Sequence, residues 1–279
     1  LAEGATVLKL IILGSAAAEG WPALFCTCDV CREARLRRGK DLRHRTSYRL
    51  GDHLQIDWGP DTYAASIAQG LDMSTLTDLV FTHSHQDHFA PAELGFRRPG
   101  FSLVPEENTL TVHGAAAVGD ALQQTLPDFA RFRLAFELVE AYRDHPLCDG
   151  VSLTAIPGEH DPSSGPLNFI FDTGDRKILI GHDTGWWSEQ TWDFLGGREL
   201  DLVVMDCTYG PKQNRGGHLG APDVLDARQE LVARGALAKD CRFVVNHFSH
   251  NGGWLHEQLE GYFDPHGIMV GYDGLEVEV

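Results

Sequence analysis

Basic residues are scarce in this chain. Its 279 residues include 23 Lys and Arg against 40 Asp and Glu, which gives a formal net charge of −17 with histidine neutral. Such a charge repels long polyanions, so we expect no nucleic acid polymer as a partner. The exception is a local basic patch formed by Arg32, Arg35, Arg37, Arg38, Lys40, Arg43, Arg45 and Arg49. We interpret most of it as the solvated face of a helix, with Arg45 and Arg49 as the members that could reach a phosphate on a small anionic ligand.

Long apolar runs are also absent. No segment approaches the roughly 18 consecutive apolar residues of a membrane helix, so no membrane association is expected. The apolar run 7–13 before small residues resembles a signal peptide, but Glu3 replaces the expected basic start and the run is short. We therefore interpret it as a first strand. No linker, internal repeat or low-complexity tract interrupts the chain, and we expect one domain spanning 1–279.

A disulfide framework is lacking as well. The six cysteines are Cys26, Cys28, Cys31, Cys148, Cys207 and Cys241. The first three lie within six residues, and clustered thiols favour a reducing, cytoplasmic location. They form either a redox pair or buried apolar cluster, or a zinc site, which we favour because a soft cation relieves the repulsion between thiolates. A closed zinc site needs a fourth ligand, and we choose His250, three residues beyond His247.

The stretch 82–88 is the richest in chemistry. It reads Thr-His-Ser-His-Gln-Asp-His, and it places His83, His85, Asp87 and His88 directly after the apolar run 79–81. A single histidine is usually a surface or packing residue. Polar groups at this density after a buried strand need a compensating partner, and imidazole with carboxylate suits divalent transition ions. The sequence therefore predicts a loop that contributes to two metal sites.

Two ions need more ligands than this loop provides. His160, Asp183 and His247 each follow an apolar, β-branched run. Strand ends are where a rigid sheet holds site residues, so these three are the predicted additional ligands. His182 precedes Asp183, but strand alternation directs it to the opposite face, and we do not expect it to be a ligand. Surface or packing roles are expected for His44, His53, His113, His145, His256 and His266.

The hydrophobic pattern predicts alternating strands and helices. Strands are expected near 7–13, 45–57, 79–82, 110–113, 151–156, 167–172, 177–182, 201–206, 242–246 and 267–271. Helices are expected near 114–125, 188–195, 222–234 and 254–262, besides a basic helix that begins after the clustered cysteines. Pro222 in a first turn and Gly235 after a last turn support the third of these.

The ordered series of histidines and aspartates resembles the metallo-β-lactamase fold superfamily. The matching positions are His83, His85, Asp87, His88, His160, Asp183 and His247. The resemblance implies an α/β fold, an αβ/βα four-layer sandwich of two mixed β-sheets flanked by helices. It also implies that His83, His85 and His160 hold one metal, that Asp87, His88 and His247 hold the other, and that Asp183 bridges them. A metal-bridging hydroxide would then be the nucleophile.

A second resemblance narrows the first. The stretch 13–23, followed by Cys26, Cys28 and Cys31, is similar to the phosphodiesterase of the bacterial carbon-phosphorus lyase pathway and its relatives. In that group three cysteines and a histidine bind a structural zinc, and His250 matches this histidine. The resemblance implies a Cys3His zinc-binding loop near 26–31. It also implies that His218, in a glycine-rich loop, is the general acid, although by spacing alone His218 could be an exposed loop residue.

The sequence allows two interpretations for each of four residues near the predicted site. Asp57 and Asp206 end strands, and each either accepts a hydrogen bond from a ligating histidine or is a turn residue. Trp186 and Trp187 follow Asp183 in a loop that should overhang the metals. They either stack on a nucleobase or sugar or simply pack as a lid.

The predicted function is that of a binuclear metal-dependent hydrolase. We expect a phosphodiesterase that acts on a small or cyclic phosphodiester, such as a cyclic ribose phosphate or a cyclic nucleotide. Its cofactors would be two Mn²⁺ or Zn²⁺ ions and one structural Zn²⁺, its partner a small phosphorylated substrate, and a homodimer is possible. The alternatives are a lactone or thioester hydrolase and a non-hydrolytic protein like the quinone-cofactor biosynthesis protein B family. That family lacks the full ligand set, whereas every position is filled here.

Overall fold

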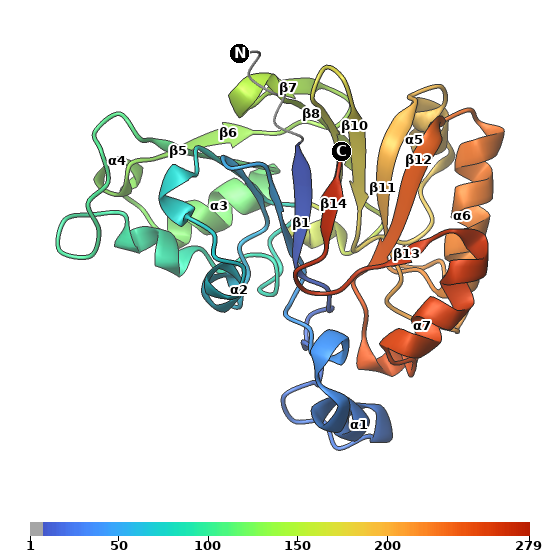
Figure 1. Cartoon of the computed structure of the whole chain (residues 1–279). Coiled ribbons are helices and arrows are strands. Elements are labelled where there is room, and N and C mark those ends of the chain that lie inside the picture. Colours follow the sequence, from blue (N-terminus) through green and yellow to red (C-terminus); the bar gives the residue numbers. More distant parts are fainter. Residues whose placement is uncertain (1–7) are drawn as a thin grey trace, which may run out of the picture.

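Two seven-stranded sheets face each other in the computed structural model, which describes residues 8–279 (Figure 1). The first sheet has the order β14-β1-β2-β3-β4-β5-β6, with bounds Glu276–Glu278, Lys9–Gly14, Ser47–Leu50, Leu54–Ile56, Asp78–Val80, Leu110–Gly114 and Leu134–Leu138. The second has the order β13-β12-β11-β10-β9-β8-β7, with bounds Met269–Val270, Leu237–Asn246, Leu200–Asp206, Lys177–Gly181, Leu167–Asp172, Ser152–Pro157 and Asp144–Pro146. Both sheets mix parallel and antiparallel pairs.

Helices cover the outer faces of both sheets. The α-helices are α1 Asp29–Arg37, α2 Thr62–Ala68, α3 Ala116–Thr125, α4 Phe129–Phe132, α5 Glu189–Leu195, α6 Ala221–Ala233 and α7 His256–Phe263. Figure 1 shows α2, α3 and α4 on the side of the first sheet and α5, α6 and α7 on the side of the second. Helix α1 lies apart from these layers, below β1 in the view. In the described part of the chain, no helix combines the length and the apolar character needed to cross a bilayer.

Strand alternation explains the four layers. In β10, Ile178 and Ile180 are buried between the two sheets, whereas Leu179 is buried under the outer helices. In β11, Leu202 and Val204 are likewise buried between the two sheets, and Val203 is buried under the outer helices. Because successive side chains of a strand point to opposite faces, such fully apolar strands can only lie in a sheet covered on both sides. The predicted αβ/βα sandwich is confirmed.

Three details of the predicted elements were wrong. The expected strand 45–57 is the hairpin β2–β3, because Gly51 adopts a left-handed φ of 58° and reverses the chain. The basic helix begins at Asp29, between the cysteines rather than after them. The strands β6, β7 and β14 were missed because most of their residues are exposed or half-exposed and form no long apolar run. Val7, at the start of the expected first strand, lies outside the described residues.

Candidate metal centre

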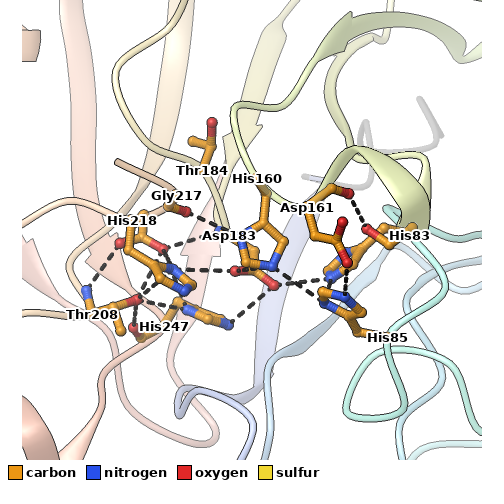
Figure 2. A network of polar contacts seen from close by, with 12 residues as sticks. His83, His85, His160, Asp161, Asp183, Thr184, Thr208, Gly217, His218 and His247 are labelled. Carbon is orange, nitrogen blue, oxygen red and sulfur yellow. Dashed lines mark hydrogen bonds and ion pairs between the residues drawn. The ribbon is translucent and has the colours of Figure 1, made fainter. Parts of the chain in front are cut away.

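The candidate ligands lie at the carboxyl ends of strands from both sheets. The loop 82–88 follows β4, His160 follows β8, Asp183 follows β10 and His247 follows β12. Strands β10, β11 and β12 are parallel, and β8 runs in the same direction because both β8 and β10 are antiparallel to β9. Their ends therefore meet at one edge of the sandwich, next to the end of β4. Figure 2 shows His83, His85, His160, Asp183 and His247 pointing toward one another.

Three residues at this edge have a left-handed backbone. Asp57, Asp183 and His247 have φ values of 60°, 53° and 63°. A non-glycine residue in this region costs on the order of 1–3 kcal/mol, and such residues cluster at functional sites. Asp57 and His247 directly follow the last residues of β3 and β12, and Asp183 lies two residues after the end of β10. The sheet therefore fixes the strained backbone and directs each side chain into the cluster.

The first ligand set consists of His83, His85, His160 and Asp183, whose ligand atoms lie within 4.8 Å of one another. His83 Nε2 is 3.0 Å from His85 Nδ1 and 3.0 Å from Asp183 Oδ2. His160 Nε2 is 3.2 Å from His85 Nδ1. Ligands at about 2.0–2.1 Å in a tetrahedron are separated by roughly 3.4 Å, so this spacing fits one metal ion.

The second set consists of Asp87, His88, Asp183 and His247. His88 Nε2 is 3.0 Å from Asp87 Oδ2 and 3.2 Å from Asp183 Oδ2, and His247 Nε2 is 3.8 Å from the same Asp183 oxygen. The carboxylate of Asp183 thus belongs to both sets. A shared carboxylate lets two ions lie close together.

Unpartnered atoms support the fit of metal ions. The Nε2 atoms of His88 and His247 are buried, and among the described residues the carboxylate oxygens near them are not aligned for a hydrogen bond. Buried polar atoms are nearly always satisfied, because an unsatisfied one costs free energy. A cation bound between these rings and Asp183 would satisfy both.

The charge of the cluster points the same way. Asp57, Asp87, Asp183 and Asp206 are each at most 5 % exposed. Burial opposes their ionisation, but neighbouring imidazoles outweigh it and hold the pKa of each carboxyl below its usual range. No Lys or Arg from the described part of the chain lines the adjoining cavity. Four buried negative charges require compensation, which two divalent cations would supply.

Two histidines in the cluster differ in their affinity for protons. Burial, and then repulsion by His88, lowers the pKa of His83 to about 4, so this ring is neutral and offers a lone pair. Burial opposes a charge on His88 too, but Asp87 and Asp57 outweigh it and raise its pKa well above the usual value. The position of His88 Nε2 therefore attracts positive charge.

The second ring nitrogen of every candidate histidine ligand is held in place. The contacts are His83 Nδ1 with Thr82 Oγ1 at 3.0 Å, His85 Nε2 with Asp161 Oδ2 at 3.3 Å, His88 Nδ1 with Asp57 Oδ2 at 2.7 Å, His160 Nδ1 with the Gly217 carbonyl at 3.2 Å, and His247 Nδ1 with Thr208 Oγ1 at 2.9 Å. Such contacts fix the tautomer and the orientation of a ligating ring. Asp57 therefore supports a candidate ligand and is not merely a turn residue.

His182 does not lie where strand alternation predicted. It is buried beside the site, with Nε2 3.1 Å from Asp57 Oδ2 and its ring stacked on His88 at 5.2 Å. The reason is that β10 ends at Gly181, so the alternation stops before His182. It lies outside both ligand sets and packs beneath them.

Asp206 organises the other end of the cluster. Its carboxylate accepts hydrogen bonds from the Thr208 and Leu219 amides, and it lies 3.2 Å from His218 Nδ1 and 3.3 Å from His247 Nδ1. Asp206 therefore contacts a candidate ligand, His247, and is not merely a turn residue. His218 Nδ1 is also 3.2 Å from Asp183 Oδ1. Burial opposes protonation of His218, but Asp206 and Asp183 outweigh it and raise its pKa to about 9.

The three clustered cysteines meet His250, as predicted. The Sγ atoms of Cys26 and Cys28 are each 3.6 Å from His250 Nδ1, and Cys31 completes a group within 4.8 Å. Tetrahedral zinc with sulfur at about 2.3 Å and nitrogen at about 2.0 Å gives a separation of roughly 3.6 Å. Burial raises the pKa of the Cys31 thiol to about 12, so a thiolate there needs a cation. The residues fit a structural zinc, which would join the first loop of the chain to the loop after β12.

A cavity of about 220 Å³ opens beside the histidines and aspartates. Its lining includes His85, Asp87, His160, Asp183 and His247, together with His218. The remaining lining residues come from the loops after β1, β11 and β12. The cluster is therefore accessible to a small ligand.

The arginines expected to reach a phosphate do not line this cavity. Arg45 pairs with Asp61 at 3.0 Å. Arg49 is buried and donates to the carbonyls of Gly51 and Asp72, because it lies on β2 rather than at its end. Arg43, expected on a solvated helix face, is also buried. It donates to Ser15 and His256, since the chain has left the helix by that point.

The two tryptophans after Asp183 pack inside the protein. Trp187 is buried and donates its Nε1 hydrogen to Asn168 Oδ1 at 2.8 Å. Trp186 is half-buried, packs against Trp192 with tilted rings whose centroids are 4.9 Å apart, and lies under the Arg215 guanidinium at 4.0 Å. Neither lines the cavity, so packing is the interpretation that agrees with the structure.

Sequence reasoning missed several supporting residues. Thr82 and Asp161 are adjacent in sequence to His83 and His160, and this adjacency was a usable signal. Thr208 follows Asp206 by two residues, but nothing in the pattern indicated that it contacts His247. Glu19, which lines the cavity, gave no signal at all.

A two-sheet αβ/βα sandwich with histidine and aspartate ligands at its strand ends defines the metallo-β-lactamase fold class. The family model described as "Beta-lactamase superfamily domain" matches residues 55–239, and the chain belongs to this superfamily. The predicted resemblance is confirmed.

Solved structures share the fold over nearly the whole chain. A diphosphatase from the PhnP family has a TM-score of 0.77 at 20% identity and covers 98% of each chain. Zn²⁺-bound PqqB from Methylobacterium extorquens has a TM-score of 0.76 at 18% identity and covers 97% of this chain and 100% of its own. Human tRNase Z, short form, has a TM-score of 0.65 at 17% identity and covers 97% of this chain and 99% of its own.

One curated relative matches a short segment. It is an octanoyltransferase of Porphyromonas gingivalis, 34% identical over 85 residues. The match spans 29% of this chain and only 16% of the relative's length.

Proposed function

We propose that this protein is a two-metal hydrolase that cleaves small phosphodiesters. His83, His85 and His160 would hold one ion, Asp87, His88 and His247 the other, and Asp183 would contact both. The observation that carries this proposal is the convergence of two ligand sets on one shared carboxylate beside a small cavity. We propose Mn²⁺ or Zn²⁺ at these positions, and a structural Zn²⁺ on Cys26, Cys28, Cys31 and His250.

Ions bound there would polarise the phosphoryl oxygens and lower the pKa of a water molecule. The protein's own groups orient the ligands and supply negative charge. Asp57 and Thr208 orient the rings of His88 and His247 through their outer nitrogens. The buried aspartates keep the negative charge that retains the cations.

His218 supports a phosphodiester in preference to a carbonyl substrate. An alcohol that leaves a phosphodiester needs a proton, and imidazole at the cavity wall can donate one. Asp206 and Asp183 hold His218 Nδ1 at 3.2 Å, so its Nε2 hydrogen is the one available to the leaving oxygen. A lactone needs less assistance at its leaving group, so His218 would have no role there.

The size of the cavity and the similar structures also support this choice. A cavity of about 220 Å³ suits a small ester better than a folded RNA. One similar structure is named a diphosphatase from the PhnP family, a name that refers to hydrolysis at phosphorus. An isothiocyanate hydrolase of the same fold, with a TM-score of 0.53, marks the range of chemistry that the fold supports.

Turnover of chromogenic esters by the purified protein tests the proposal. The metal content is measured first, and about three ions per chain are expected from the three ligand sets. The protein is then assayed with bis(p-nitrophenyl) phosphate, a 2′,3′-cyclic nucleotide and a lactone. We expect turnover of the two phosphodiesters. Turnover of the lactone alone by fully metallated protein would contradict the proposal.

A further inference from the structure

The cavity contains a carboxylate for which the proposed reaction has no use. Glu19 lies in the loop after β1 and lines the cavity together with His85, Asp87 and His247. Its Oε1 accepts a hydrogen bond from Ser249 Oγ and lies 3.4 Å from His250 Nε2. Within residues 8–279, no hydrogen bond to Oε2 is formed, and the side chain is 29% exposed. One oxygen is therefore fixed, and the other is available to a ligand.

The loop that carries Glu19 is held on several sides. A hydrogen bond of 2.9 Å from the Gly20 amide to the Ala17 carbonyl closes a tight turn around Glu19. The Ala17 amide donates to the Phe248 carbonyl at 2.9 Å, which joins this loop to the one carrying Ser249. His250 contacts the cysteines through Nδ1, so its Nε2 faces Glu19. The carboxylate is thus positioned before a ligand arrives, which limits the entropy lost on binding.

The wall around Glu19 has a defined chemistry. Beyond the candidate ligands, His218 and Thr208, the cavity is lined by Ala17, Ala18, Glu19, Tyr209, Ser249 and Asn251. This wall contains a hydroxyl, a phenol, an amide and one carboxylate, and no Lys or Arg within the described chain. Lys212 donates a hydrogen bond to the carbonyl of Asn251, but Lys212 itself does not line the cavity. A second phosphate at this wall would meet a carboxylate without a cation, whereas hydroxyl groups would find both donors and acceptors.

A cationic group is a weaker fit. Sites for quaternary ammonium groups surround the charge with several aromatic faces. Among the lining residues that the structure describes, Tyr209 is the one Phe, Tyr or Trp side chain, so no aromatic cage surrounds a cation there. Neighbouring hydroxyls of a polyol can donate hydrogen bonds to the Glu19 carboxylate and the Ser249 hydroxyl, and this needs no aromatic cage.

We propose that Glu19 is a specificity-determining residue that accepts hydrogen bonds from hydroxyl groups on the organic part of the substrate. The inference rests on the proposed function and narrows it to diesters of a polyol or sugar that carries no second phosphate at this wall. Glu19 acts in substrate selection and not in the chemical step.

A matched pair of chromogenic diesters tests this inference. 4,5-Dihydroxypentyl p-nitrophenyl phosphate and pentyl p-nitrophenyl phosphate have the same leaving group and chain length. They differ in the vicinal hydroxyls, which lie too far from phosphorus to displace p-nitrophenolate by closing a five-membered ring. The loss of charge-assisted hydrogen bonds changes kcat/KM by about tenfold or more. We therefore expect the metallated wild type to prefer the diol ester by at least about tenfold, mainly through KM.

The variant Glu19→Gln should reduce this ratio toward one, because the amide lacks the charge. Glu19→Asp, which keeps the charge but withdraws it from the wall, should also lower the ratio, and it replaces Glu19→Gln if that variant does not fold. Glu106→Gln is the matched control, since Glu106 is exposed and distant from the cavity lining. A binding measurement without turnover, calorimetry of glycerol 1-phosphate against propyl phosphate, should show the same preference and the same loss.

The outcomes separate the two proposals. Equal turnover of both esters by the wild type would overturn the role of Glu19 and leave the phosphodiesterase intact. A preference that persists in Glu19→Gln and Glu19→Asp would also overturn it, as would a stronger preference for a choline ester. No turnover of any diester by fully metallated protein would remove the proposed function, and this inference with it.

Discussion

Asp57 Oδ2 lies 2.7 Å from Nδ1 of His88, and both side chains are completely buried. The carboxylate holds the ring so that Nε2 faces Asp87 and Asp183. Replacing Asp57 by Asn should weaken metal binding on the His88 side by roughly 10–100-fold, the usual cost of losing such a contact. Metal titration with a chelating competitor measures this change.

Asp78 provides a matched control for this variant. It forms an equally short 2.7 Å contact with His113, also buried, but away from the ligand sets. Asp78→Asn should lower the stability of the fold without changing the metal content. If both variants retain wild-type metal affinity, Asp57 has no role in orienting His88.

His218 should matter in proportion to the difficulty of the leaving group. In His218→Asn the ring that would protonate the departing oxygen is missing, so turnover of alkyl diesters should fall by roughly 10²–10⁴-fold. p-Nitrophenolate leaves without a proton, and its release should fall far less. The comparison of kcat for the two kinds of ester is the measurement. His266→Asn, at an exposed site, is the control, and equal losses for both esters would exclude the acid role.

Loss of the His250 ring should release the structural zinc. His250→Ala leaves three cysteines without their fourth partner, so one zinc per chain should be lost and the melting temperature should fall. Elemental analysis and thermal unfolding measure the two effects. His53→Ala removes a histidine that pairs with Asp149 at the surface and should change neither quantity. Unchanged zinc content in His250→Ala would refute this ligand.

His256 should make the stability depend on pH in the acid range. Burial, and then the Arg43 guanidinium, lowers its pKa from 6.5 to about 4. The unfolded chain therefore binds a proton below about pH 6.5, whereas the folded chain does not until about pH 4. Stability is complete above this window and falls as the pH drops through it, by about 3 kcal/mol at most.

Urea unfolding at several pH values measures this dependence. The buried aspartates and bound metals also respond to acid, so the informative quantity is the difference between the wild type and His256→Gln. Glutamine can still accept the hydrogen bond that Arg43 donates to His256 Nδ1, but it cannot be protonated. A difference that does not change with pH would contradict the prediction.

The ligand series illustrates what local sequence can predict. His83, His85, Asp87 and His88 lie within six residues after an apolar run, so their density alone indicated a metal loop. Asp183 and His247 each follow an apolar run, which placed them at strand ends. Residues such as Glu19 and Arg49 could not be assigned in this way, because their partners Ser249 and Asp72 are distant in sequence.

The sequence by itself determined the layered α/β class and the candidate ligands, because both depend on periodicity and on the spacing of chemically distinctive side chains. The resemblance implied that Asp183 bridges two ligand sets and that His250 joins the cysteines. Only the tertiary structure gave the distances between these groups and showed that Trp187 and Arg49 are buried. The ligand distances arise where strands of two sheets end at one edge, and they depend on how the sheets pack rather than on any local pattern. Arg49 is instead buried by contacts beside the β2–β3 turn.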